Sequence, residues 1–277
     1  MWHIGVSGLP PASTYANVAL QQHINYQELP IITAMSIAGT TNDTSGNTNA
    51  ADLATTVGWW VSNVGAFAPI MDHIAINIAN EWGPLNSSVW ATAYESAIAR
   101  LRAAGYTCPL VIDAGRSGQD PADIINYGQQ VFDSDPQRNV IFSLHVYNYF
   151  YDTVSGVAQQ WSSQPDLQTS TDALAATGLP IIYGEFGPGR NVGPAPTVLT
   201  PARVVQAAEG ANFGWIAWAW DDNDLANCAS DNNWFGMVYS CGKYSVPSDL
   251  TWFGLDMTLN PAYGLDALAS PPSAFLP

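Results

Sequence analysis

The chain has 277 residues, enough to bury the core of one large domain or of two ordinary ones. It carries 23 acidic residues against 7 basic ones, for a formal net charge of −16, and no lysine or arginine precedes Arg100. This charge argues strongly against nucleic acids and anionic membranes as partners, because both are bound through positively charged surfaces. No apolar run approaches the roughly 20 residues of a membrane span. The composition therefore suits a neutral ligand, but the simpler explanation of the acidity, which we favour, is that it keeps the protein in solution.

Short apolar runs alternate with longer amphipathic stretches along the chain, without a linker or an internal repeat, which predicts a single domain over residues 1–277. The first run, Trp2–Ser7, is a partial strand. The later runs are continuously apolar, as expected of parallel strands covered on both faces. They are Ile31–Ile37, His73–Ala79, Leu110–Asp113, Val140–His145, Pro180–Gly184 and Gly214–Trp218.

Helices are predicted between these strands. The stretch Ser87–Ala104 is preceded by residues that cap helices and ends before Gly105, while Pro121–Phe132 and Pro201–Gly210 each begin with proline. The strands recur every 30 to 40 residues or so, the length of one βα unit. The predicted fold class is α/β, a (β/α)8 TIM barrel incomplete at its N-terminus. An open doubly wound sheet is the alternative, but no glycine-rich phosphate loop follows the first strand.

In a βα barrel the active site lies at the carboxyl ends of the strands. Polar and aromatic residues stand at four of these ends: Asn80, Glu81, Trp82, His145, Tyr147, Glu185, Trp218 and Trp220. Glu81 and Glu185 are three units apart, so they face each other across the barrel mouth. Retaining glycoside cleavage needs such a pair, in which one carboxyl protonates the leaving oxygen and the other, about 5 Å away, attacks the anomeric carbon.

Three of these segments carry a resemblance to a known family. Ile76–Glu81, Phe142–Tyr147 and Ile182–Gly187 resemble glycoside hydrolase family 5 (clan A), and within it the bacterial endo-β-1,4-mannanases most. Further matching segments follow in the same order, at residues 111–114, 118–120, 214–220 and 259–264. The resemblance spans residues from about 15 to 270 and implies a TIM barrel with a two-glutamate double-displacement mechanism.

The resemblance also implies a role for each residue at the strand ends. Glu81 corresponds to the acid/base and Glu185 to the nucleophile. Asn80 would bind the 2-hydroxyl of the sugar under attack, Tyr147 would donate a hydrogen bond to Glu185, and His145 would support the pair. Trp218 would be the floor on which a sugar ring stacks. Trp220 and Trp82 would be walls of neighbouring subsites, with a purely packing role as the alternative for either.

The chain departs from the family at three points. The family carries an arginine late in the second strand that keeps the nucleophile ionised, but no arginine precedes Arg100 here. The segment Ser36–Gly39 lacks the histidine that usually follows the third strand, and the first strand and helix are missing. Loss of the arginine should raise the pKa of Glu185. The incomplete frame predicts either an impaired, carbohydrate-binding barrel or a homo-oligomer formed at the open barrel edge.

The preferred substrate is β-1,4-mannan or glucomannan, and the alternative is an endo-β-1,4-glucanase (cellulase) with the same catalytic pair. The loops 42–50 and 221–250 are expected to build subsites or a rim.

The sequence predicts no cofactor, no metal and a secreted protein, with no signal peptide in this chain. Cys228 and Cys241 could form a disulfide worth roughly 3 kcal/mol, while Cys108 is expected to be buried.

Overall fold

The protein is described by a computed structural model that covers residues 11–35, 47–147, 151–152, 159–160, 164–187, 200–220, 236–238 and 245–269. Within these residues, six parallel strands form one sheet in which spatial order follows chain order. They are β1 (Ile31–Thr33), β2 (Ala75–Asn77), β3 (Leu110–Asp113), β4 (Val140–Val146), β7 (Ile181–Phe186) and β8 (Gly214–Ala217). A separate antiparallel pair consists of β5 (Tyr151–Asp152) and β6 (Gln159–Gln160).

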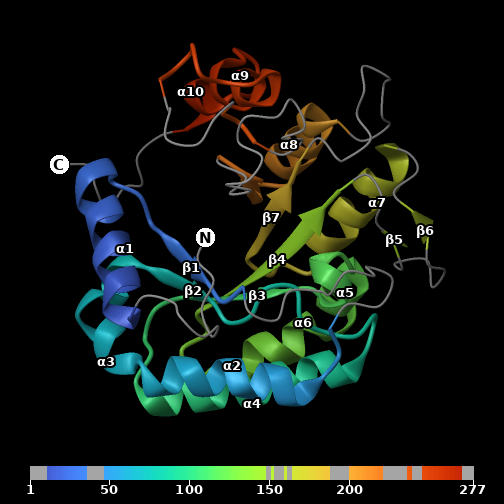
Figure 1. Cartoon of the computed structure of the whole chain (residues 1–277). Helices are drawn as coiled ribbons and strands as arrows, with labels where there is room; N and C mark the ends of the chain where they lie inside the picture. Colours follow the sequence, from blue (N-terminus) through green and yellow to red (C-terminus); the bar gives the residue numbers. More distant parts are fainter. Residues whose placement is uncertain are drawn as a thin grey trace.

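Helices follow the strands and cover the outside of the curled sheet (Figure 1). Successive helices contact one another, α2 with α4, α4 with α6, α6 with α7 and α7 with α8. The helices are α1 (Ala12–Tyr26), α2 (Ala50–Ser62), α3 (Val64–Phe67), the 3-10 helix η1 (Ala68–His73), α4 (Ser88–Ala104), α5 (Gly115–Gly118), α6 (Pro121–Ser134), α7 (Gln164–Ala175), α8 (Pro201–Gly210), α9 (Trp252–Leu259) and α10 (Leu265–Leu268). None of these described helices combines the length and apolar composition needed to cross a membrane.

This arrangement confirms the predicted fold class, because the parallel sheet with a helix after each strand is part of a (β/α)8 barrel. The described sheet has six strands, and the predicted partial strand Trp2–Ser7 lies outside the described residues. The strand predicted from His73 begins only at Ala75, since η1 occupies residues 68–73. The strand predicted as Ile31–Ile37 is observed over Ile31–Thr33, and its last two residues are not described.

The sequence signals at the ends of α4 act as expected. The side chain of Ser87 accepts a hydrogen bond from the backbone N–H of Val89, and Gly105 ends the helix in a left-handed conformation with φ of 105°. Buried aromatic side chains join α2 to the segments that follow β2 and α4. Trp60 donates its indole N–H to the carbonyl of Ile78 at 2.9 Å, and Tyr106 donates its hydroxyl to the carbonyl of Trp60 at 2.8 Å.

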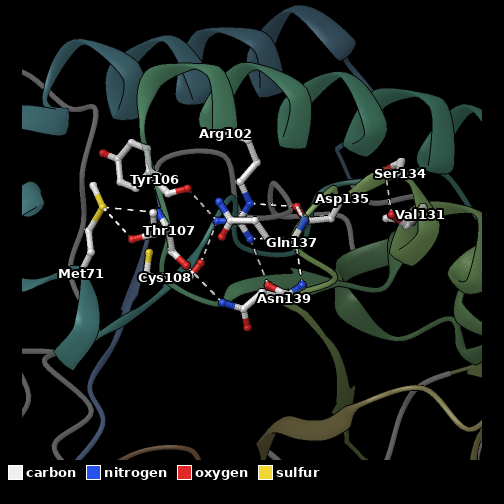
Figure 2. Close-up of polar contacts among 10 residues, drawn as sticks. All are labelled: Met71, Arg102, Tyr106, Thr107, Cys108, Val131, Ser134, Asp135, Gln137 and Asn139. Carbon is white, nitrogen blue, oxygen red and sulfur yellow. Dashed lines mark hydrogen bonds and ion pairs between the residues drawn. The ribbon is translucent and has the colours of Figure 1, made fainter.

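A polar cluster joins α4 to the segments that precede β3 and β4 (Figure 2). Arg102 on α4 forms a bidentate ion pair with Asp135, with Nε–Oδ1 and Nη2–Oδ2 distances of 2.9 and 2.7 Å. Its guanidinium also donates to the carbonyl of Cys108, two residues before β3, and to that of Asn139, immediately before β4. Cys108 is buried, as predicted. The amino ends of β3 and β4 are thus fixed to α4, while the carboxyl ends of the strands carry the functional side chains.

Candidate active site

The carboxyl ends of the strands bring Glu81, His145 and Glu185 together. Glu81 follows β2, His145 lies in β4 and Glu185 in β7. One carboxylate oxygen from each glutamate and one nitrogen of His145 all lie within 4.8 Å of one another. His145 Nδ1 is 3.0 Å from Glu81 Oε1 and 3.5 Å from Glu185 Oε2, so the imidazole bridges the two carboxylates.

Glu81 is held through its backbone as well as its side chain. Its φ of 57° is in the left-handed region, which a residue with a Cβ rarely adopts. Its N–H donates to Asp113 Oδ2 at 2.9 Å, and the side chain of Asn77 donates to Asp113 Oδ1 at 2.8 Å. Asp113 is not among the site residues that the sequence predicts. The available signal was its position as the last residue of the strand Leu110–Asp113.

Glu185 lies in a more closed environment than Glu81. Its side chain is 7% exposed, against 17% for Glu81. The Tyr147 hydroxyl donates to Glu185 Oε2 at 2.8 Å, whereas Oε1 is buried and has no hydrogen-bond partner among the described residues. Burial raises the pKa of Glu185 to about 7, helped by the nearby charge of Glu81 and opposed by His145 and the Tyr147 hydrogen bond. The carboxyl is therefore protonated in mildly acidic solution.

His145 is buried among three carboxylates. Its Nε2 lies 3.6 Å from Asp113 Oδ2, while Nδ1 faces the two glutamates. Burial by itself lowers the pKa of His145, but the charges of Glu185 and Asp113 and the hydrogen bonds to Asp113 and Glu81 raise it well above 6.5 overall. The surrounding carboxylates thus favour the protonated imidazolium, whose positive charge partly offsets the negative charge of the site.

The short helix α5 covers the imidazole. Gly118 has φ of 75°, and a Cβ at this position would collide with the ring of His145. Arg116 and Ser117 also have positive φ values, of 50° and 56°. This tight backbone brings residues 115–118 against His145, and a glycine is required at the point of closest approach.

The remaining predicted residues differ in how they are placed. Asn80 is buried, and its Oδ1 has no hydrogen-bond partner within the described part of the chain. Trp218 is half-buried and Trp220 is 38% exposed, so both offer surface to a ligand. Trp82 does not. It is 0% exposed, donates its indole N–H to the carbonyl of Asn49 at 2.9 Å and packs edge-on against Tyr94. Trp82 is therefore a core residue, because a fully buried ring cannot stack on a sugar.

Two further predictions concern metal and disulfide. Glu81, His145 and Glu185 are a set of donors close enough to hold a metal ion within the described part of the chain. Glu81 already bonds His145, and Glu185 accepts from Tyr147, so these atoms have partners within the protein. The absence of a metal stays a prediction. Cys228 and Cys241, with most of the two loops predicted to form subsites, lie outside the described residues.

Comparison with known proteins agrees with this geometry. A family model described as cellulase (glycosyl hydrolase family 5) matches residues 17–224. A mannan endo-1,4-beta-mannosidase of Salipaludibacillus agaradhaerens is 34% identical over 183 residues, covering 66% of this chain and 55% of that protein. One of Cellvibrio japonicus is 31% identical over 204 residues, covering 73% and 44%. The chain thus spans about half the length of these relatives.

Among solved structures, the mannohexaose complex of the Thermomonospora fusca beta-mannanase has a TM-score of 0.73 at 26% identity, covering 97% of this chain and 80% of that one. The fold and the paired strand-end carboxylates define a βα barrel of the glycoside hydrolase class. With the match of the family model to most of its length, the chain belongs to glycosyl hydrolase family 5.

Proposed function

We propose that this chain is a retaining, endo-acting glycoside hydrolase that cleaves β-1,4-mannan or glucomannan. The separation of Glu81 and Glu185 carries the proposal, since they offer carboxylate oxygens within 4.8 Å of each other. Carboxyl groups about 5 Å apart suit direct attack on the anomeric carbon, whereas inverting enzymes hold them roughly 6.5–9.5 Å apart to admit a water molecule. The close approach of these oxygens supports retention rather than inversion.

The surroundings of the two carboxyls support different roles for them. Glu185 is the nucleophile, because Tyr147 and His145 fix its Oε2 and stabilise the ionised form. Glu81 is the acid/base, since its side chain is more exposed and can exchange its proton with water between the two steps. Glu81 protonates the leaving oxygen as Glu185 attacks, and then deprotonates the water that releases the sugar from Glu185.

Sugar binding is assigned to three residues beside this pair. The unpartnered Asn80 Oδ1 accepts a hydrogen bond from the 2-hydroxyl of the sugar under attack. The half-buried ring of Trp218 stacks on a sugar face, and the more exposed Trp220 contacts a neighbouring sugar. These assignments leave out Trp82, whose ring is inside the core.

Mannan is preferred as substrate because the first two relatives described above are named mannan endo-1,4-beta-mannosidases and a similar structure is a mannohexaose complex. The name of the matching family model, cellulase, favours β-1,4-glucan as the second candidate. A third candidate is a non-catalytic carbohydrate-binding barrel. It is favoured by the raised pKa of Glu185, which leaves less of the nucleophile ionised.

A reducing-sugar assay on mannan, glucomannan and carboxymethyl cellulose separates these candidates. Wild-type protein should release sugar fastest from mannan or glucomannan, and Glu185→Ala should release none. Glu95→Ala is the matched control, because Glu95 is half-buried on α4, bonded only to Gln130 among the contacts observed, and should keep wild-type rates. Faster release from carboxymethyl cellulose would identify a glucanase. Retarded migration in polysaccharide gels without any release would identify a binding module and contradict the proposal.

We also propose that the protein is secreted and that it associates through an open barrel edge. The support for association is that β1 and β8 each pair with only one strand within the described sheet, and unpaired strand edges favour association between chains. Light scattering at micromolar concentration should give the mass of a dimer or larger assembly, and a monomer would contradict association. Recovery from the culture medium rather than from cells tests secretion.

A further inference from the structure

We infer that Asp113 is a positioning residue that holds Glu81 and His145 in place relative to each other. This inference rests on the proposed function, because it concerns the acid/base of that reaction. Asp113 is the last residue of β3, the strand next to the one that precedes Glu81, and its side chain is 0% exposed. It is therefore screened from solvent and acts through its neighbours.

Both carboxylate oxygens of Asp113 accept hydrogen bonds from the side that faces β2, and the side chains of Ser143 and His145 on β4 interact with the carboxylate from the other neighbouring strand. Oδ2 accepts the backbone N–H of Glu81 at 2.9 Å, and Oδ1 accepts the side-chain N–H of Asn77 at 2.8 Å. The indole of Trp90 donates to the backbone carbonyl of Asp113 at 3.0 Å, which fixes the main chain on the other side. The carboxylate consequently has one orientation, and that orientation presents Oδ2 to Glu81.

The hydrogen bond to Glu81 supports a backbone conformation that is otherwise unfavourable. Glu81 has φ of 57°, and such strain persists only where the surroundings fix it. A bond to an ionised acceptor is stronger than one to a neutral acceptor. Because the left-handed turn directs the Glu81 side chain, loss of this bond would displace the carboxyl that must reach the leaving oxygen.

Asp113 also acts on His145 from the side opposite the glutamates. Asp113 Oδ2 is 3.6 Å from Nε2, while Glu81 and Glu185 face Nδ1 at 3.0 and 3.5 Å. A negative charge beside Nε2 favours a proton on that nitrogen and favours the charged imidazolium. The charged groups that face the ring are thus Asp113 from β3, Glu81 after β2 and Glu185 from β7. One carboxylate oxygen of Asp113 therefore influences both the place of Glu81 and the charge of its partner.

The variant Asp113→Asn separates this role from simple support of the fold. Asparagine has one acceptor and one donor group, so it cannot accept from both Asn77 and Glu81, and it removes the charge beside His145. We expect kcat on mannan to fall about 100-fold with little change in KM, as for a displaced catalytic group. In NMR titrations of the histidine side chains, His145 should lose its proton roughly one pH unit lower.

Asp123→Asn is the matched control. Asp123 is also fully buried and accepts two backbone N–H groups, from Ser87 at 2.9 Å and Gly115 at 3.0 Å, without an observed contact to Glu81 or His145. The Asp123→Asn variant should be less stable than wild type. Its kcat should stay within about threefold of the wild-type value, and its His145 should titrate within about a few tenths of a pH unit of the wild-type histidine. Equal losses of kcat in the two variants, with an unchanged His145 titration, would overturn the inference.

Asn77→Ala covers the case in which Asp113→Asn does not fold. It removes the bond to Asp113 Oδ1 but leaves the charge, so kcat should fall by about tenfold while the His145 titration holds. A wild-type kcat in this variant would overturn the inference. If wild-type protein hydrolyses no polysaccharide, the proposed function fails, yet the His145 titration of Asp113→Asn still tests the electrostatic part of the inference.

Discussion

The Tyr147→Phe variant tests how the nucleophile is kept ionised. The Tyr147 hydroxyl donates to Glu185 Oε2 at 2.8 Å and lowers the pKa of a carboxyl that burial raises to about 7. Phenylalanine keeps the ring in its buried position but removes the donor. Glu185 should then hold its proton to higher pH, because the bond that favoured its ionised form is gone.

The size of the effect follows from the strength of this hydrogen bond. A bond to a charged group contributes about 1.5–3 kcal/mol, and 1.36 kcal/mol corresponds to one pKa unit, so the pKa of Glu185 should rise by about one to two units. Near pH 7 about half of the wild-type carboxyls are ionised, against less than about a tenth in the variant. The kcat/KM at that pH should therefore fall about 5- to 50-fold.

The assay is the pH dependence of kcat/KM on a soluble β-1,4-mannan oligosaccharide, from about pH 5 to about pH 10. The acidic limb, which reports ionisation of the nucleophile in the free enzyme, should lie near pH 7 in wild type and move upward in Tyr147→Phe. Tyr127→Phe is the control, because Tyr127 is half-buried on α6 and removed from the strand ends. An acidic limb of Tyr147→Phe that coincides with that of wild type would refute the reasoning.

Three further predictions concern stability. Asp135→Ala leaves the Arg102 guanidinium buried without its ion-pair partner. The free energy of unfolding in urea should therefore fall by about 3–5 kcal/mol, while kcat stays unchanged. A loss below about 1 kcal/mol would contradict the role given to the ion pair. Gly115→Ala places a Cβ against Asp123 Oδ2 and the carbonyl oxygen of Pro84. The free energy of unfolding should fall by about 1–3 kcal/mol because of this overlap. An unchanged melting temperature would contradict this prediction and show that the backbone relaxes around the new methyl group. Burial raises the pKa of Asp123 from 3.8 to about 8, so the folded protein retains a proton that the unfolded chain releases. Wild type should accordingly lose stability relative to Asp123→Asn as pH rises through this window, by at most about 1.4 kcal/mol per pH unit, and parallel stability curves would contradict the shift.

The strands and most helix ends could be predicted because their signals are local. β3 and α8 have the predicted bounds, since a continuous apolar run marks a strand covered on both faces and Pro201 marks the first turn of its helix. Errors arose where tertiary packing decides the outcome. Residues 68–73 form a 3-10 helix although they lead directly into the apolar run of β2. Nothing in the local pattern of apolar residues distinguishes a helix from a strand at this point.

The composition of the site was less predictable than its position. The strand-end rule locates Glu81, His145 and Glu185, but it does not say which side chains the core covers, and Trp82 is covered. Asp113 acts through the backbone of Glu81, 32 residues away, and such a contact has no local signature. The sequence predicts a raised pKa for Glu185 from a missing arginine. The direction agrees with the structure, in which burial is the largest cause, and burial depends on packing.

The central claim is that Glu185 attacks the sugar and forms a covalent intermediate. An activated 2-deoxy-2-fluoro-mannoside slows the release of such an intermediate, so that digestion and mass spectrometry identify the labelled residue. One added sugar is expected on the peptide that contains Glu185, and no label is expected in Glu185→Ala. A label on another residue, or hydrolysis with inversion at the anomeric carbon and no label, would contradict it.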